Sequence, residues 1–326
     1  MRREEWIEYL EVDEADLMEA EAVLDAPVPH GTYQFTKKRF VVLLAAGMLL
    51  AACFAVAAAG TQKGGGQLAS YFGVSGEEEE ELLERLEVES GTVVEDAGYT
   101  MQVTEAASDG KSVYAVVTVT APEGEPLEGE RYVLEAGVPW IMTDRKGSGY
   151  PCFGGGGINE MGRPAQNKVS FLLDWDFQGN LKGKKLVLEI SRIVEENEGG
   201  QRVLADGNWT LVMDVPKSRT KSRLQWTRVE TEGDVYYVYR VEVTPLGIHI
   251  HAVKWPGGET GATKDSFLNL PVTIGYQDGS RGNGSGEAAG SGGLFCEKTV
   301  HYDGNRLMDP EKIREVWLGE TGLKLD

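Results

Sequence analysis

The chain has 326 residues and a mass of 35.6 kDa, with 52 acidic and 32 basic side chains and a formal net charge of −20. Nucleic-acid binding needs a clustered surplus of lysine and arginine, so this composition argues against a nucleic-acid partner. Hydrophobic residues make up 41% of the chain, which is enough for folded cores, and the 42 glycines lack the period that collagen requires.

The first 39 residues form an acidic segment with 10 acidic and 5 basic side chains. A helix is predicted over residues 4–24, because leucine recurs every seven residues and places a narrow apolar stripe on one side. A segment this short cannot bury the stripe alone, so it is either a solvated, frayed tail or a docking helix for a partner's groove. In the docking interpretation, the binding side chains are Trp6, Ile7, Leu10, Asp13, Asp16, Leu17 and Leu24.

Residues 40–60 are apolar throughout and predict a transmembrane helix, because about 20 helical residues cross the hydrocarbon layer of a bilayer. A secretory signal peptide would start closer to the N-terminus. Three basic residues precede the run and only Lys63 follows shortly after it, which predicts a cytoplasmic N-terminus and an extracytoplasmic remainder. The orienting residues are Lys37, Lys38 and Arg39.

The three cysteines give no disulfide framework. Cys53 ends a Leu-Ala-Ala-Cys sequence that resembles the site at which bacterial lipoproteins are acylated. We expect instead a cysteine inside an apolar helix, because residues 54–59 stay apolar where a lipoprotein would turn polar. Cys152 and Cys296 are expected to be unpaired thiols, since they fall in different predicted domains.

Residues 61–89 are predicted to form an acidic juxtamembrane linker. The sequence TQKGGG gives it a flexible start, and residues 77–89 predict a short charged helix with Leu82, Leu83 and Leu86 on one side. We expect its acidic face to be solvated.

From residue 90 the hydrophobic period changes to two, which is typical of strands. Short strands separated by glycine-rich turns predict a first β-sandwich domain over residues 90–215. Asp109 and Gly110 predict the turn before the second strand. The clearest strands are predicted at residues 113–120, 168–173, 186–193 and 209–215.

A basic linker over residues 216–223 leads to a second, smaller β domain over residues 224–326. Its strands are predicted at 235–243, 248–253 and 270–276, followed by a helical turn at 309–314 and a last strand at 315–318 or 323–325. Residues 279–293 contain seven glycines and predict a floppy hairpin insertion. The fold class is therefore mainly β, with two sandwich-like domains after one membrane helix and a short helical segment.

Three sequences carry a resemblance to a known family: GTVVEDAGYTMQVTEAASDGKSVYAVVTVTAP (residues 91–122), YRVEVTPLGIHIHAV (239–253) and LMDPEKIREVWLGETGLKL (307–325). With the layout above, they resemble single-pass envelope proteins of Gram-positive bacteria that have an uncharacterised extracytoplasmic β-domain. The resemblance implies an immunoglobulin-like C-terminal domain, an anti-sigma-factor-like role and an extracytoplasmic-function sigma factor as partner. It implies no catalytic residues, and the zinc-binding His and Cys cluster of some anti-sigma domains is missing before the membrane helix.

Few residues indicate site chemistry. His249 and His251 lie two apart on a predicted strand and share a face, so they are weak metal candidates, with His301 as a third ligand. The alternative that we favour is a polar strand face. Asp174 and Asp176 likewise share a face, and a solvated pair is favoured over calcium binding because six or more oxygens are not at hand. Nucleotide-binding and serine-hydrolase motifs are absent from the sequence, so we expect no enzyme and no cofactor.

The sequence therefore predicts a regulatory protein of the cell membrane that transduces a signal to transcription. Its outer β-domains would sense an unknown envelope signal or ligand, and its N-terminal segment would hold a sigma factor. The alternative from another class is an envelope-anchored binding or adhesion protein with an inert cytoplasmic tail.

Overall fold

The structure is a computed structural model that describes residues 66–88, 92–142, 149–151, 154–177, 181–216, 220–231, 233–255, 266–292 and 295–325. The predictions for residues 1–39, for the apolar run 40–60 and for Cys152 lie outside these residues. Within the described ranges, no helix has both the length and the apolar character needed to cross a membrane. The prediction of a mainly β fold is confirmed, since strands account for most of the described elements.

Two short helices, α5 (Gln67–Tyr71) and α6 (Glu77–Leu86), precede the strands. Glu105 caps α5 from a neighbouring strand, because its carboxylate accepts the backbone N–H of Gln67 at 2.8 Å and of Leu68 at 2.9 Å. Four glutamates occupy the first turn of α6 and suit its dipole. Leu82 and Leu86 are buried, so the predicted helix and its leucine face are confirmed.

The first β unit consists of two five-stranded sheets. One sheet has the order β1-β2-β3-β8-β7, and its strands are Val93–Asp96, Tyr99–Ser108, Ser112–Thr120, Lys168–Phe177 and Gly154–Ala165. The other has the order β10-β9-β5-β6 with β4 paired to β9, and its strands are Gly200–Asp214, Lys185–Asn197, Trp140–Met142, Gly149–Pro151 and Arg131–Ala136. All the pairings are antiparallel.

The two sheets bury one shared core. Alternate residues of β3, including Val113 and Val117, meet Trp209 and Leu211 of β10 in this core, as the period of two predicts. The other face of β3 is also buried, because the leucines of α5 and α6 cover it. The indole N–H of Trp209 donates to the carbonyl of Tyr99 at 3.0 Å, which satisfies the one polar group of this large buried side chain.

The second β unit is one antiparallel sheet of eight strands in the order β11-β12-β13-β16-β15-β14-β17-β18. Its two halves pack around a shared core that contains Val241 and Ile250 from one half and Ile274 and Val316 from the other. Two 3₁₀ turns, η1 (Asp303–Asn305) and η2 (Pro310–Lys312), join β16 to β17, so the predicted helical turn is confirmed. The strands are Lys221–Glu230, Val235–Val243, Gly247–Lys254, Phe295–Tyr302, Arg281–Gly292, Val272–Tyr276, Ile313–Leu318 and Thr321–Lys324.

The prediction of a floppy insertion at residues 279–293 is wrong, because β15 forms there and pairs with both β14 and β16. Glycine permits close packing in this strand rather than providing flexibility. A Cβ at Gly282 would lie 2.7 Å from the hydroxyl of Tyr276, and one at Gly284 would overlap the side chain of Val300.

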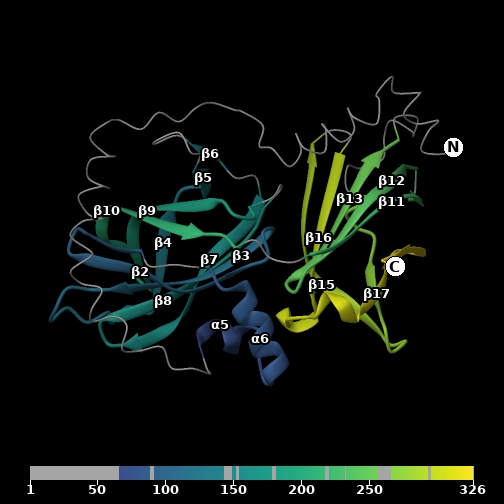
Figure 1. The fold of residues 1–326 in the computed structure, drawn as a ribbon. Helices are drawn as coiled ribbons and strands as arrows, with labels where there is room; N and C mark the ends of the chain where they lie inside the picture. Colours follow the sequence, from purple (N-terminus) through teal and green to yellow (C-terminus); the bar gives the residue numbers. More distant parts are fainter. Residues whose placement is uncertain are drawn as a thin grey trace.

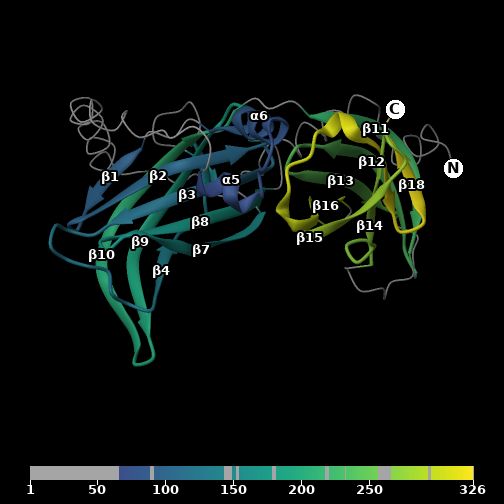
Figure 2. The ribbon, with the colours of Figure 1, turned by 90° about the horizontal axis from the view of Figure 1, so that it is seen from below.

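The two β units lie side by side, with α5 and α6 at the place where they meet (Figures 1 and 2). Leu68, Leu82 and Leu86 of these helices share an apolar cluster with Leu246 and Leu307 of the second unit. The helices that follow the predicted membrane exit therefore contact both units.

We expect Leu86→Ala to lower the free energy of unfolding by about 2–5 kcal/mol, because it leaves a cavity beneath α6. Urea denaturation of the full chain, followed by tryptophan fluorescence, measures this change. Glu84→Ala is the matched control on the exposed face of α6 and should change stability by no more than about 0.5 kcal/mol. Equal effects of the two substitutions would contradict the packing of α6.

Candidate functional site

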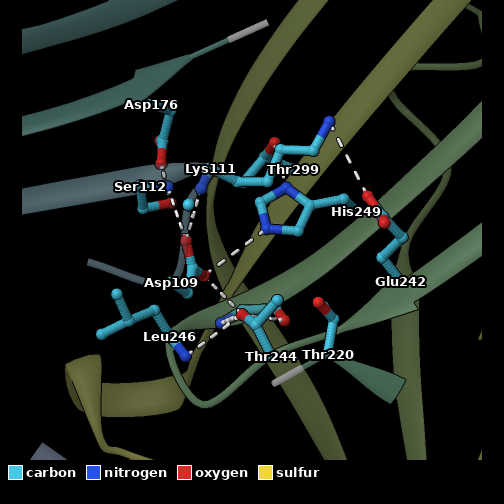
Figure 3. A network of polar contacts seen from close by, with 12 residues as sticks. Asp109, Lys111, Ser112, Asp176, Thr220, Glu242, Thr244, Leu246, His249 and Thr299 are labelled. Atoms are coloured by element: carbon cyan, nitrogen blue, oxygen red, sulfur yellow. Dashed lines mark hydrogen bonds and ion pairs between the residues drawn. The ribbon is translucent and has the colours of Figure 1, made fainter. Parts of the chain in front are cut away.

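A buried polar junction lies between the two β units, where the turn between β2 and β3 meets the turn between β12 and β13 (Figure 3). The side chain of Asp109 is fully buried there. One of its oxygens accepts the backbone N–H groups of Lys111 and Ser112, both at 2.7 Å, in the arrangement typical of an Asp turn. Gly110, which follows Asp109 in the turn, takes a positive φ of 91°, so the predicted Asp-Gly turn is confirmed.

The second oxygen of Asp109 links the two units. It accepts the hydroxyl of Thr244 at 2.5 Å, and the same Thr244 oxygen accepts the backbone N–H of Gly247 at 3.0 Å. Tyr302 donates its hydroxyl to the carbonyl of Thr244 at 2.6 Å and so fixes the turn from behind. Burial raises the pKa of Asp109, but hydrogen bonds and the charge of His249 outweigh this effect and the net pKa is lowered. The buried carboxylate is therefore ionised at neutral pH.

Ion pairs flank the link between Asp109 and Thr244 on one side. The ammonium group of Lys111 lies 3.3 Å from Glu297 and 3.7 Å from Glu242, and the Lys111 side chain is almost fully buried. Glu242 also lies 2.8 Å from the guanidinium of Arg240. Burial raises the pKa of Glu242 and of Glu297, but their histidine and lysine neighbours lower it by a larger amount. The net pKa of each carboxyl is lowered, so both stay charged.

A second polar contact crosses the junction at Asp176. One carboxylate oxygen accepts the hydroxyl of Ser112 at 2.5 Å, and the other lies 2.9 Å from Nε2 of His301 in the second unit. The Nδ1 atom of His301 lies 3.3 Å from the hydroxyl of Tyr114 and 3.3 Å from the carbonyl of Leu246. Asp176 is therefore bound across the junction. The prediction that it is a solvated residue is wrong.

His249 and His251 share a strand face, but this face is covered by the first unit. His249 lies 3.0 Å from the hydroxyl of Thr299 and 3.7 Å from Asp109, while His251 lies 3.3 Å from Glu242. Within the described ranges, no group of three or more His, Cys, Asp or Glu residues is arranged to hold a metal. The two histidines are contact residues of the junction, on a strand face that the first unit covers.

The other predicted site residues fall outside the part of the chain that the structure describes. They are Trp6, Ile7, Leu10, Asp13, Asp16, Leu17, Leu24, Lys37, Lys38 and Arg39. Cys296 is buried with a free thiol, and burial raises its pKa to about 11, so the thiol is protonated and inert at neutral pH.

Sequence reasoning did not bring together the residues that carry the junction, namely Asp109, Lys111, Asp176, Glu242, Thr244 and Glu297. One signal was present, because glutamate interrupts two apolar strands at residues 242 and 297. Buried carboxylates of this kind need charged partners. Chemically, the named groups bind one another across the junction, so the arrangement is suited to holding two units in one geometry rather than to acting on a substrate.

Comparison with known proteins gives the fold alone. No family model and no curated protein matches the chain. A solved structure that it resembles is the crystal structure of the conserved domain protein from Bacillus anthracis, at 15% identity and a TM-score of 0.52. The match covers 77% of this chain and 83% of that chain, which is more than either β unit could supply alone.

A double-mutant cycle tests the link between Asp109 and Thr244. We expect Asp109→Ala to cost about 3 kcal/mol or more and Thr244→Val about 1–3 kcal/mol, because each leaves a buried polar group without its partner. The double variant should lose less than the sum of the two, with a coupling energy of about 1–3 kcal/mol in urea denaturation.

The control cycle uses the ion pair of Lys185 and Asp214, whose side chains are about half exposed. Its coupling should stay below about 1 kcal/mol. A coupling between Asp109 and Thr244 as small as that of the control would contradict the junction.

Proposed function

We propose that the chain is a single-pass membrane regulator, an anti-sigma factor whose outer β units sense an envelope signal. The supporting observation is the position of α5 and α6. Helix α5 begins at Gln67, with six residues between it and the apolar run at 40–60, and the leucines of α5 and α6 pack on both units. A change in how the units dock would therefore alter the packing of the chain segment that leads to the membrane.

The cytoplasmic half of the proposal rests on the sequence. The stripe of Leu10, Leu17 and Leu24, with Trp6 and Ile7, would enter an apolar groove of an extracytoplasmic-function sigma factor. Asp13 and Asp16 would face the basic surface with which that partner binds DNA or polymerase. Competition for this surface would keep the sigma factor inactive until the outer units respond.

We also propose that the two units are the β-sandwich-like domains of the Gram-positive family that the sequence resembles, with the second as its immunoglobulin-like module. The facing sheets of the first unit support this assignment. For the second unit, the support is that two halves of one sheet pack around a common core.

The alternative of an envelope-anchored binding or adhesion protein is favoured by a different observation. An aromatic group lies apart from the core of the second unit and contains Trp226, Tyr237 and Trp255. The ring centroid of Tyr237 lies 5.5 Å from that of Trp226 and 6.0 Å from that of Trp255. Trp226 and Trp255 are partly exposed, and aromatic side chains that combine an apolar body with a polar group suit ligand binding. In this case the cytoplasmic tail would be inert.

To separate the two functions, the full chain and a Leu10→Asp/Leu17→Asp variant are purified from cells and their bound proteins compared. We expect sigma factors to co-purify with the wild type and to be lost at least tenfold in the variant, because the charges remove the apolar stripe. A Leu224→Asp variant, at an exposed position of the second unit, is the control and should retain the partner.

Deletion of residues 1–36, with Lys37 to Arg39 retained, provides the transcriptional readout. Release of a sigma factor should raise the expression of its target genes. Unchanged transcription, together with no enrichment of sigma factors on the wild type, would contradict regulation and favour the adhesion protein.

A further inference from the structure

The strength of the contact between His301 and Asp176 depends on whether the His301 ring carries one proton or two. The three histidines that the structure describes lie in or beside this junction, and His301 bridges to a carboxylate on β8 of the first unit. Both side chains are mostly buried, with 13% and 16% of their surface exposed. Water therefore screens this pair less than it screens a surface pair.

The hydrogen-bond partners of His301 differ between its two protonation states. With a proton on Nε2 only, the ring donates to Asp176, and Nδ1 accepts the hydroxyl of Tyr114 at 3.3 Å. With both nitrogens protonated, Nδ1 donates to the carbonyl of Leu246 at 3.3 Å, and the ring carries a positive charge beside Asp176. The charged form therefore makes the stronger contact across the junction.

Charged and polar groups face the three histidines from several elements of both units. Asp176 and Asp109 act on His301 from two elements of the first unit, and Tyr114 faces it from a third. Asp109 also faces His249, with Glu297 acting on it from β16. His251 is faced by Glu242, by Glu297 and by the ring of Tyr239.

The pKa of His301 gives the sign of the effect. Burial lowers this pKa, but the hydrogen bond and the charge of Asp176 outweigh burial, so the net shift is upward. In separated units the ring would return to its ordinary pKa of about 6.5. Docking therefore binds protons, and its stabilisation by His301 is complete below that value and lost as pH rises through the raised pKa.

The carboxylates of the junction act in the opposite direction and in another pH range. The pKa values of Asp109, Glu242 and Glu297 lie below their ordinary values in the docked structure, so any contribution of these carboxylates is present above their ordinary range of about 4 and is lost only in stronger acid. Between weak acid and neutral pH, both sets of groups support docking. Above this range only the histidine contribution is lost.

We propose that the junction is a proton-operated latch, in which protonated His301 holds the two β units together and loss of its proton as the pH rises loosens them. The latch is a property of the two units, and it stands whether the chain regulates transcription or binds an envelope ligand. Release would free the second unit from the turn of Asp109 and from the helices α5 and α6.

The full chain with ¹³C-labelled histidine tests the proposal by NMR titration, with the His301 resonance assigned from His301→Gln. Hydrogen exchange, corrected for the intrinsic effect of pH, then reports opening of the turns at residues 109–112 and 244–247. We expect a pKa of His301 above its ordinary value of about 6.5 and a loss of protection as the pH rises through that raised pKa. That loss should be about tenfold for each unit by which the pKa is raised.

Asp176→Asn should return the pKa of His301 to its ordinary value or below and remove the loss of protection that accompanies a rise in pH. Asp214→Asn makes the same chemical change in an exposed ion pair of the same unit and should leave both measurements as in the wild type. Protection of the core strand amides at residues 116–119 shows that each variant is folded. If Asp176→Asn itself fails to fold, Tyr114→Phe keeps both charges and should retain the dependence on pH.

A pKa of His301 at or below 6.5 in the wild type would overturn the latch. So would the same loss of protection in the wild type and in Asp176→Asn. Neither result bears on whether residues 1–39 bind a sigma factor, because the readouts are confined to the two β units.

Discussion

The burial of one charged carboxylate, that of Asp109, is the constraint on which the arrangement of the two β units depends. An ionised carboxylate without partners is very unfavourable in a protein interior, so Asp109 can be buried only when its oxygens are fully hydrogen-bonded. Its own turn supplies two backbone N–H groups, and Thr244 of the other unit supplies the third donor. Docking therefore completes the solvation of a charge that the first unit already holds in place.

The alternation of side chains along each strand divides the roles of its two faces. In β13, Ile248 and Ile250 enter the core of the second unit, while His249 and His251 point to the junction. In β3, one face enters the core that the two sheets of the first unit share, and the other lies beneath α5 and α6. Apolar contacts thus hold each unit together, and a polar layer with an apolar rim joins the units.

The sequence predicts those features of the structure whose physical cause lies within a few neighbouring residues. The alternation in β3 and β12 lies within each strand, and their bounds follow from it almost to the residue. The glycine-rich strands β7 and β15 were missed because neighbouring strands, rather than their own side chains, stabilise them. The junction joins residues 135 and 125 positions apart, so the sequence shows the histidine face of β13 but not the surface that covers it.

A junction made of charges is better suited to a defined geometry than to great stability. Replacing buried ion pairs with apolar residues is often neutral or stabilising, whereas removing one partner is costly. The polar layer therefore fixes how the units dock, and it makes docking sensitive to the loss of any single charge. Leu246 and Leu307 add the apolar contact that joins this layer to α5 and α6. Because these helices precede the first strand, a change in docking would alter the packing of their leucines at the N-terminal side of the described chain.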